Sequence, residues 1–224
     1  MGLCVGIVLL LTVQGTVYGI GTPDYVAALN PGFEHEILAY SCGTYLFISN
    51  HSSIIQLDKE LNEITQWNIP NVSMMVHNEE TLYAWNGSMV FSLNLTTGTM
   101  YSQGMEDVTS MLCVQGHLVV SNVSNTVVMD PMLQSVHTRN GSYSILLEHG
   151  QEILAVNQSG LSILSPELNL THFEPFAGIT DMVLTEEYII LANMSCIHIL
   201  NTTFEEVMNI TLEGNITLAA WHNL

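Results

Sequence analysis

The sequence predicts an all-β protein built from repeats of about 36 residues. Five copies of one pattern recur, each an apolar run, an Asn in an N-x-S/T triplet and a second apolar run. The five asparagines are 36, 36, 35 and 36 residues apart, at Asn50, Asn86, Asn122, Asn157 and Asn193. The runs are short, rich in Val, Ile, Leu and aromatic residues, and separated by Asn, Gly, Ser and Asp. These are strand and turn signals rather than helix signals.

Each repeat predicts four antiparallel strands, here lettered a to d in chain order. Strand a is an apolar run such as DMVL at 181–184, strands b and c flank the repeated Asn, and strand d is a weaker segment such as EITQWNI at 63–69. Strand c ends in Asp, Asn or Ser, which cap their own backbone in tight turns, so a second hairpin is expected there. The predicted repeats span 36–70, 71–106, 107–141, 142–178 and 179–215, with a partial sixth at 216–224.

Four antiparallel strands in a unit of about 36 residues resemble a β-propeller blade of the broad WD-repeat and quinoprotein-like kind. The resemblance covers residues 36–215 and is architectural, because the Gly-His and Trp-Asp signatures of WD-repeats and the kelch double glycine are absent. It implies about five four-stranded blades and carries over no family's function. A five-bladed ring with accessory terminal strands, one of them at 25–29, and a piece of a larger propeller both fit the pattern.

Strand a is expected to be the most enclosed strand of each blade. Its predicted core positions are Met75, Leu112, Leu146 and Val183.

The first residues resemble a secretory leader. An apolar stretch at 3–13 is too short to span a bilayer, and the small residues Gly15, Gly19 and Gly21 after it suit a signal-peptidase site. We interpret 1–21 as a signal peptide and 22–224 as a single domain. The usual basic n-region is missing, so an uncleaved membrane anchor is the alternative. No later stretch is long and apolar enough to cross a membrane, so membrane insertion is not expected.

Twelve N-x-S/T triplets without Pro at the middle position follow the leader. Because so many of these triplets recur at the same place in the repeat, they predict a secreted, extracellular glycoprotein. The asparagines of the triplets are expected to lie on the surface. The predicted glycosylation sites are Asn50, Asn71, Asn86, Asn94, Asn122, Asn140, Asn157, Asn169, Asn193, Asn201, Asn209 and Asn215.

The chain is strongly acidic. It has 21 Asp and Glu residues against two basic residues, Lys59 and Arg139, for a formal net charge of -19. This charge repels nucleic acid, heparin-like polymers and anionic membranes, and it favours an extracellular protein or glycan partner with a basic patch. Selection against trypsin-like cleavage and compositional drift both account for the shortage of Lys and Arg.

Cysteine use is sparse. Cys42, Cys113 and Cys196 remain after leader removal, so at most one intrachain disulfide can form and a third thiol is left over. The chain therefore has no disulfide framework.

The propeller resemblance also implies where a ligand binds. In a blade the b–c and d–a turns lie on one face of the disc and the a–b and c–d turns on the other, with the a–b turns around the channel mouth. Eight of the twelve triplets fall on b–c and d–a turns, which leaves the a–b turns bare. The candidate binding residues on those turns are Glu79, Glu80, His117, His149, Glu186 and Glu187. Ordinary solvated turn residues are the alternative interpretation.

No motif in the sequence indicates catalysis. G-x-S-x-G, a Gly-rich phosphate loop and a calcium loop are absent. Neighbouring carboxylates such as Glu79 and Glu80 point to opposite sides of an extended backbone, which does not suit acid/base chemistry. We therefore expect no catalytic residues, no metal and no cofactor, and a binding protein without catalytic activity. The alternative is a glycan-binding lectin or a glycan-acting enzyme that uses the channel mouth.

Overall fold

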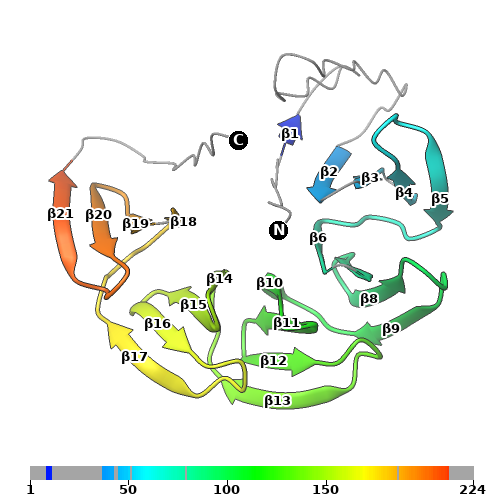
Figure 1. The fold of residues 1–224 in the computed structure, drawn as a ribbon. Coiled ribbons are helices and arrows are strands. Elements are labelled where there is room, and N and C mark those ends of the chain that lie inside the picture. The colour runs from blue at the N-terminus through cyan, green and yellow to red at the C-terminus, as the bar shows by residue number, and fades with distance from the viewer. Residues whose placement is uncertain are drawn as a thin grey trace. The chain divides into compact units, whose positions relative to one another are not determined.

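The computed structural model describes residues 9–11, 37–42, 45–50, 52–78, 80–185 and 187–211. The chain divides into two compact parts, an N-terminal half at 1–106 and a C-terminal half at 107–224, each described by itself below. Every regular element within the described ranges is a β-strand, as Figure 1 shows. No helix in this part of the chain is long and apolar enough to span a membrane.

The N-terminal half contains two sheets. The first has the order β1-β2-β3-β4-β5 and the second β6-β7-β8-β9. The strands of the first sheet are β1 Leu9–Leu11, β2 Ile37–Cys42, β3 Tyr45–Ser49, β4 Ile54–Leu57 and β5 Glu63–Trp67. Those of the second are β6 Met74–His77, β7 Thr81–Trp85, β8 Met89–Asn94 and β9 Met100–Gly104.

The C-terminal half contains three sheets of four strands, each in chain order. The third sheet comprises β10 Val108–Val114, β11 His117–Asn122, β12 Asn125–Met129 and β13 Ser135–Asn140. The fourth comprises β14 Ile145–His149, β15 Glu152–Asn157, β16 Gly160–Leu164 and β17 Leu170–Glu174. The fifth comprises β18 Asp181–Leu184, β19 Tyr188–Ala192, β20 Cys196–Asn201 and β21 Glu206–Thr211.

Each predicted repeat supplies one antiparallel meander, so the expected strands a to d and the all-β fold class are confirmed. The first sheet has one additional strand, because β1 pairs with β2 in the register Leu9↔Ala39 to Leu11↔Ile37. β1 lies inside the predicted signal peptide, whose other residues are outside the described ranges. Cleavage near residue 21 would remove β1 and leave a four-stranded sheet like the other four. The predicted strand at 25–29 and the partial repeat at 216–224 also lie outside the described residues.

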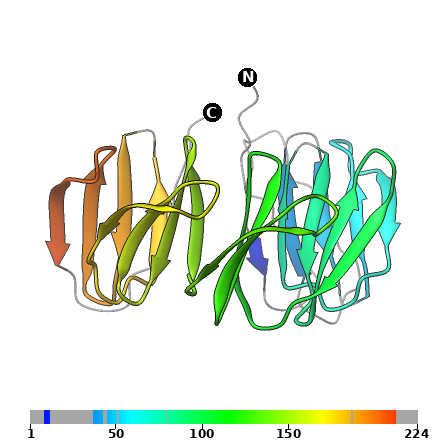
Figure 2. The ribbon, with the colours of Figure 1, turned by 90° about the horizontal axis from the view of Figure 1, so that it is seen from below.

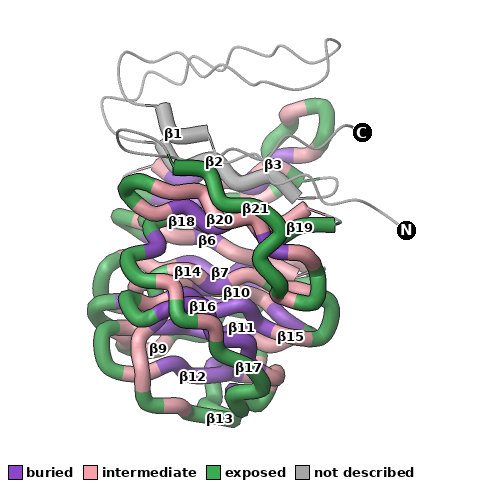
Figure 3. Tube along the Cα trace, turned by 90° about the vertical axis from the view of Figure 1, so that its left-hand side faces the viewer, coloured by how far each residue is buried: buried purple, intermediate pink, exposed green. Residues whose placement is uncertain are grey.

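Apolar side chains from facing sheets form the core within each half. In the N-terminal half, one cluster joins Phe47 and Ile54 of the first sheet to Met75 and Leu82 of the second. In the C-terminal half, one cluster lies between the third and fourth sheets and another between the fourth and fifth. The fourth sheet is therefore packed on both faces, and Figure 3 shows its central strands as mostly buried.

The core positions predicted in strand a are right for two repeats and wrong for two. Met75 and Leu146 are 5% and 4% exposed, as expected. In the other two repeats the neighbouring residues Met111 and Met182 are the buried ones, at 7% and 5% exposed. Leu112 and Val183 point to the opposite face of their strands, because side chains alternate along a strand. The apolar run alone did not reveal which alternate set of side chains is buried.

The c–d turns share a bulged conformation that the sequence analysis did not identify. In four of them a bulky residue has a left-handed backbone, at Leu61 (φ 64°), Leu133 (φ 62°), Leu168 (φ 65°) and Phe204 (φ 65°). Its N–H donates to the carbonyl three residues earlier, as from Leu168 to Ser165 at 2.8 Å, and strand c has a register shift just before the turn. This conformation costs about 1–2 kcal/mol for a non-glycine residue. Burial of the side chain offsets that cost, since Leu133 and Leu168 are 2% and 3% exposed.

Candidate functional site

The repeated asparagines close the b–c turns with their side-chain oxygens. Asn122 Oδ1 accepts hydrogen bonds from the backbone N–H groups of Ser124 and Asn125, both at 2.9 Å. The same pair of bonds recurs in the other four turns, at Asn50, Asn86, Asn157 and Asn193. The repeated Asn therefore closes its turn, a role that was predicted only for the Asp, Asn and Ser residues that end strand c. The same signal, an Asn in a short turn between two apolar runs, could have predicted it here.

This turn geometry is compatible with glycosylation, because the amide oxygen holds the turn and the nitrogen is not needed for it. Among the described residues, the Nδ2 atoms of the five b–c asparagines make no hydrogen bond, and the five side chains are partly exposed. A glycan on Nδ2 would leave both Oδ1 bonds in place. The N-x-S/T pattern is thus consistent with glycosylation and, independently, with turn closure.

The remaining N-x-S/T asparagines fall in several places. Asn71 has φ 58° between β5 and β6, and Asn140 is the last residue of β13. Asn94, Asn169 and Asn201 lie at c–d turns, and Asn209 lies within β21. The Nδ2 atoms of three of these donate hydrogen bonds, to Ser165 Oγ, Glu205 Oε2 and Glu206 Oε1, from Asn169, Asn201 and Asn209. Asn215 lies outside the described residues.

Two substitutions at Asn122 separate its structural role from that of a glycan. Asn122→Asp keeps an oxygen acceptor and removes the glycan acceptor, whereas Asn122→Ala removes both. We expect Asn122→Ala to lower the free energy of unfolding by about 1 kcal/mol relative to Asn122→Asp, since two turn N–H groups lose their acceptor. Urea denaturation of enzymatically deglycosylated samples measures the difference. Equal stability of the two variants would contradict the turn-closing role.

The structure describes four of the candidate residues of the a–b turns, and each of the first three makes a local contact within its own turn. Glu80 N–H donates to Asn78 Oδ1 at 3.0 Å, and Glu187 N–H donates to Thr185 Oγ1 at 3.4 Å. His117 Nδ1 donates to the Gln115 carbonyl at 3.1 Å. Glu79 and Glu186 lie outside the described residues. Among the residues that the structure describes, no three His, Cys, Asp or Glu side chains are grouped so that they could hold a metal ion.

His149 instead takes part in an aromatic contact between two sheets of the C-terminal half. Its ring meets Phe204 edge-on, with ring centroids 6.2 Å apart, and His172 stacks on the same Phe204 ring at 5.7 Å. His172 Nε2 also lies 2.6 Å from Glu174 Oε1. Because Phe204 is in a c–d turn of the fifth sheet and His149 is at an a–b turn of the fourth, these two kinds of turn lie at the same end of the strands.

That end of the C-terminal half carries many carboxylates, and we call it the acidic end. Its seven described Asp and Glu residues are partly or fully exposed: Asp130, Glu148, Glu152, Glu167, Glu187, Glu205 and Glu206. Arg139 is the only Lys or Arg in residues 107–224. Its guanidinium Nη1 donates to the Leu168 carbonyl at 3.1 Å, so it is held at the c–d turn of the fourth sheet. The strands run between this end and the b–c turns, and Figure 2 shows turns at both ends of the strands.

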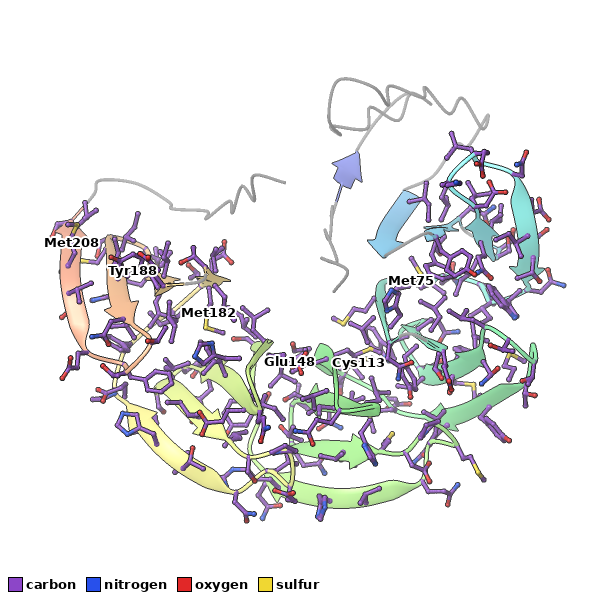
Figure 4. The ribbon with its side chains drawn as sticks, in the orientation of Figure 1. Met75, Cys113, Glu148, Met182, Tyr188 and Met208 are labelled. Carbon is purple, nitrogen blue, oxygen red and sulfur yellow. The ribbon has the colours of Figure 1, made fainter. Side chains whose placement is uncertain are left out.

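Two carboxylates of the acidic end have pKa values displaced in opposite directions. Partial burial raises the pKa of Glu148 above its usual value of 4.5, because desolvation disfavours the charged form. A hydrogen bond from the Ser165 hydroxyl at 2.7 Å lowers the pKa of Glu167. Glu148 is labelled in Figure 4 on β14.

These displacements predict opposite pH dependences for two conservative variants. Glu148 binds its proton more tightly in the folded state, so wild-type stability falls as pH rises from about 4.5 through the folded pKa. Glu148→Gln removes that loss, and its stability relative to wild type should therefore increase between pH 4 and pH 7. Glu167→Gln should show the reverse trend, since the lowered pKa of Glu167 contributes stability that is present above 4.5. Thermal unfolding across this pH range measures both, and parallel curves for Glu148→Gln and wild type would contradict the assignment.

Comparison with known proteins gives the fold but no family. No protein-family model matches the chain, and no curated protein matches it in sequence. Among solved structures, the chain is similar to BamB from Moraxella catarrhalis, with a TM-score of 0.55 and 11% identity, over 81% of this chain and 74% of that one. It is also similar to Kluyveromyces lactis Hsv2 with loop 6CD replaced by a Gly-Ser linker, with a TM-score of 0.61 and 11% identity, over 79% and 78% of the two chains.

A third similar structure is the Neurospora crassa Pan2 WD40 domain, with a TM-score of 0.59 and 14% identity, over 75% of this chain and 63% of that one. Identities this low carry no functional information. All three neighbours are WD40 or β-propeller proteins, so the predicted resemblance is confirmed. The chain has the β-propeller type of fold, made from four-stranded antiparallel blades.

Proposed function

We propose that this protein is a secreted, N-glycosylated binding protein that uses the acidic end of its C-terminal half to hold a basic protein partner and catalyses no reaction. The observation that carries the proposal is the concentration of seven exposed or partly exposed carboxylates at one end of three adjacent sheets, with a single arginine in that half. Propeller folds generally serve as interaction scaffolds, which agrees with this use.

The division of N-x-S/T asparagines between the two ends supports the choice of surface. The b–c turns of the C-terminal half place Asn122, Asn157 and Asn193 at the end opposite the acidic one. Glycans there would cover the opposite end, and they are compatible with the turn geometry because Nδ2 is unused. Two asparagines at c–d turns, Asn169 and Asn201, lie at the acidic end, but their Nδ2 atoms already donate hydrogen bonds.

A pair of charge-matched triple variants tests the binding surface. The first, Glu152→Gln with Glu187→Gln and Glu205→Gln, neutralises three carboxylates at the acidic end. The control neutralises three carboxylates at the opposite end, Asp107→Asn with Glu174→Gln and Asp181→Asn. Both remove three negative charges, one set at each end of the strands, and Glu174→Gln keeps an oxygen that can accept from His172 Nε2.

We expect the acidic-end triple to slow association with an immobilised oligolysine peptide by at least fivefold, and the control to change it by less than twofold. The wild-type rate should also fall with added salt, since exposed charges are screened over about 8 Å at physiological ionic strength. Equal slowing by both triples would show that the attraction comes from overall charge and would overturn the proposed surface. The secreted, glycosylated state is tested separately, by an N-glycosidase digestion that should lower the apparent mass by many kilodaltons.

The second candidate function is glycan binding or glycan processing at the a–b turns. A glycan array and generic glycosidase substrates distinguish it from protein binding. Salt-resistant binding to a defined glycan, or turnover of a substrate, would favour this alternative.

A further inference from the structure

The fifth sheet has an apolar face that is only partly buried. Met182, Ile189 and Leu191 point toward the fourth sheet and belong to the core between the two. Their neighbours in the strands point the other way, and the register aligns Val183 with Ile190 and Ile190 with Ile199. We call this surface the far face, made of Val183, Ile190, Ile197 and Ile199. All four residues are intermediate in exposure.

The fourth sheet provides an internal comparison. The same four positions of the repeat are occupied there by Leu147, Leu154, Leu161 and Ile163, as the matching registers show. Three of these residues, Leu154, Leu161 and Ile163, are 0%, 0% and 1% exposed, because the fifth sheet covers them. The residues of the far face are as apolar as these four residues of the fourth sheet. The main difference is that no described sheet packs on the far face. The far face therefore has the chemistry of a surface that packs against another strand layer.

The other repeats show which residue packs first on an exposed sheet face. In each half, an apolar residue near the middle of strand a packs on the sheet before it. These residues are Met75 against the first sheet, Leu146 against the third and Met182 against the fourth. Figure 4 labels Met75 and Met182 on β6 and β18. Met182 follows Leu146 by 36 residues, and the same step beyond Met182 reaches Leu218.

We propose that residues 216–221, ITLAAW, cover the far face of the fifth sheet, with Leu218 packed on it as Met182 is packed on the fourth. This segment lies outside the described residues. The chain between β21 and residue 216 spans 212–215, similar to the connections at 141–144 and 175–180 that precede β14 and β18.

Two properties favour this occupant over a second copy of the chain. Neither the segment at 216–221 nor the four residues of the far face carries a charge, so their contact buries no ion. The formal charge of -19 on each chain opposes the approach of a second copy. Alternation along an extended segment places Ile216, Leu218 and Ala220 on one side, which is the side that would meet the face.

Thiol labelling of the far face tests the proposal. Ile190→Cys provides the reporter, labelled by a brief maleimide pulse and quantified at that site by peptide mass spectrometry. Labelling is compared in the full chain, in a chain lacking residues 212–224, and in the full chain with Leu218→Asp. We expect the truncation and Leu218→Asp each to speed labelling at least tenfold. The matched control Ala219→Asp places the same charge on the opposite side of the segment and should leave the rate unchanged.

Two further reporters guard against misfolding. Met194→Cys, at a position 70% exposed, should label rapidly in every background, and Leu154→Cys, at a position 0% exposed, should stay protected in every background. Equal labelling of Ile190→Cys in the full and truncated chains would overturn the proposal. Protection that disappears on dilution and is insensitive to Leu218→Asp would identify a second copy as the occupant and would also overturn it.

Discussion

Leu154→Asp is expected to prevent accumulation of the folded protein, whereas Met208→Asp is expected to accumulate as the wild type does. Leu154 is 0% exposed and belongs to the core between the fourth and fifth sheets. A carboxylate without a partner in that position costs several kcal/mol, against a total stability of about 5–15 kcal/mol for a domain. Met208 lies in β21 and is 53% exposed, so the same charge there should change stability by about 0.5 kcal/mol or less.

A milder variant gives the same comparison as a measurable free energy. Leu154→Ala should lower the free energy of unfolding by about 2–5 kcal/mol, because it removes buried methyl groups and leaves a cavity. Urea denaturation of Leu154→Ala and Met208→Ala measures both values. If the two variants lost similar stability, or if folded Leu154→Asp accumulated at the wild-type level, the fourth sheet would not be the centre of this core.

Gly160→Ala should be the most damaging of the glycine substitutions in the described residues. Gly160 begins β16 with φ 154°, a conformation that side chains rarely adopt, and an added Cβ would overlap the carbonyl oxygen of Glu174. It would also lie 2.9 Å from the Phe176 backbone nitrogen. Both obstacles are backbone atoms, so a side-chain rearrangement cannot relieve them. The expected loss in the free energy of unfolding is about 3 kcal/mol.

Gly150→Ala is the matched control within the same sheet. Gly150 has φ 64° in the a–b turn, and nothing lies within 4 Å of an added Cβ. Its substitution should therefore cost only the left-handed conformation, about 1 kcal/mol. Comparable losses for the two variants would show that the close approach of the backbone at residue 160 does not limit the choice of side chain.

The candidate site was only partly predictable from sequence. The a–b turns carry the expected residues His117, His149 and Glu187, and the structure places each of these at the end of its strands. The stacking of His149 and His172 on Phe204 was not foreseen. The three rings come from two neighbouring sheets: His149 and His172 from the fourth and Phe204 from the fifth. The residue spacing within one repeat does not determine how adjacent sheets pack, so this contact could not be predicted.

The sequence by itself determined the four strands of each repeat, their order in each sheet and the positions of the turns between them. These features depend on short stretches of chain: apolar runs favour strands, and Asn122 or Asp130 closes a turn with its own neighbours. Tertiary structure decided which side of each strand is buried, so that Met182 packs in the core while Val183 lies on the far face. It also decided that Leu168 takes a left-handed backbone, because insertion of its side chain between the third and fourth sheets offsets the conformational cost. Both choices arise from packing between sheets, which brings together residues from different repeats and leaves no local pattern in the chain.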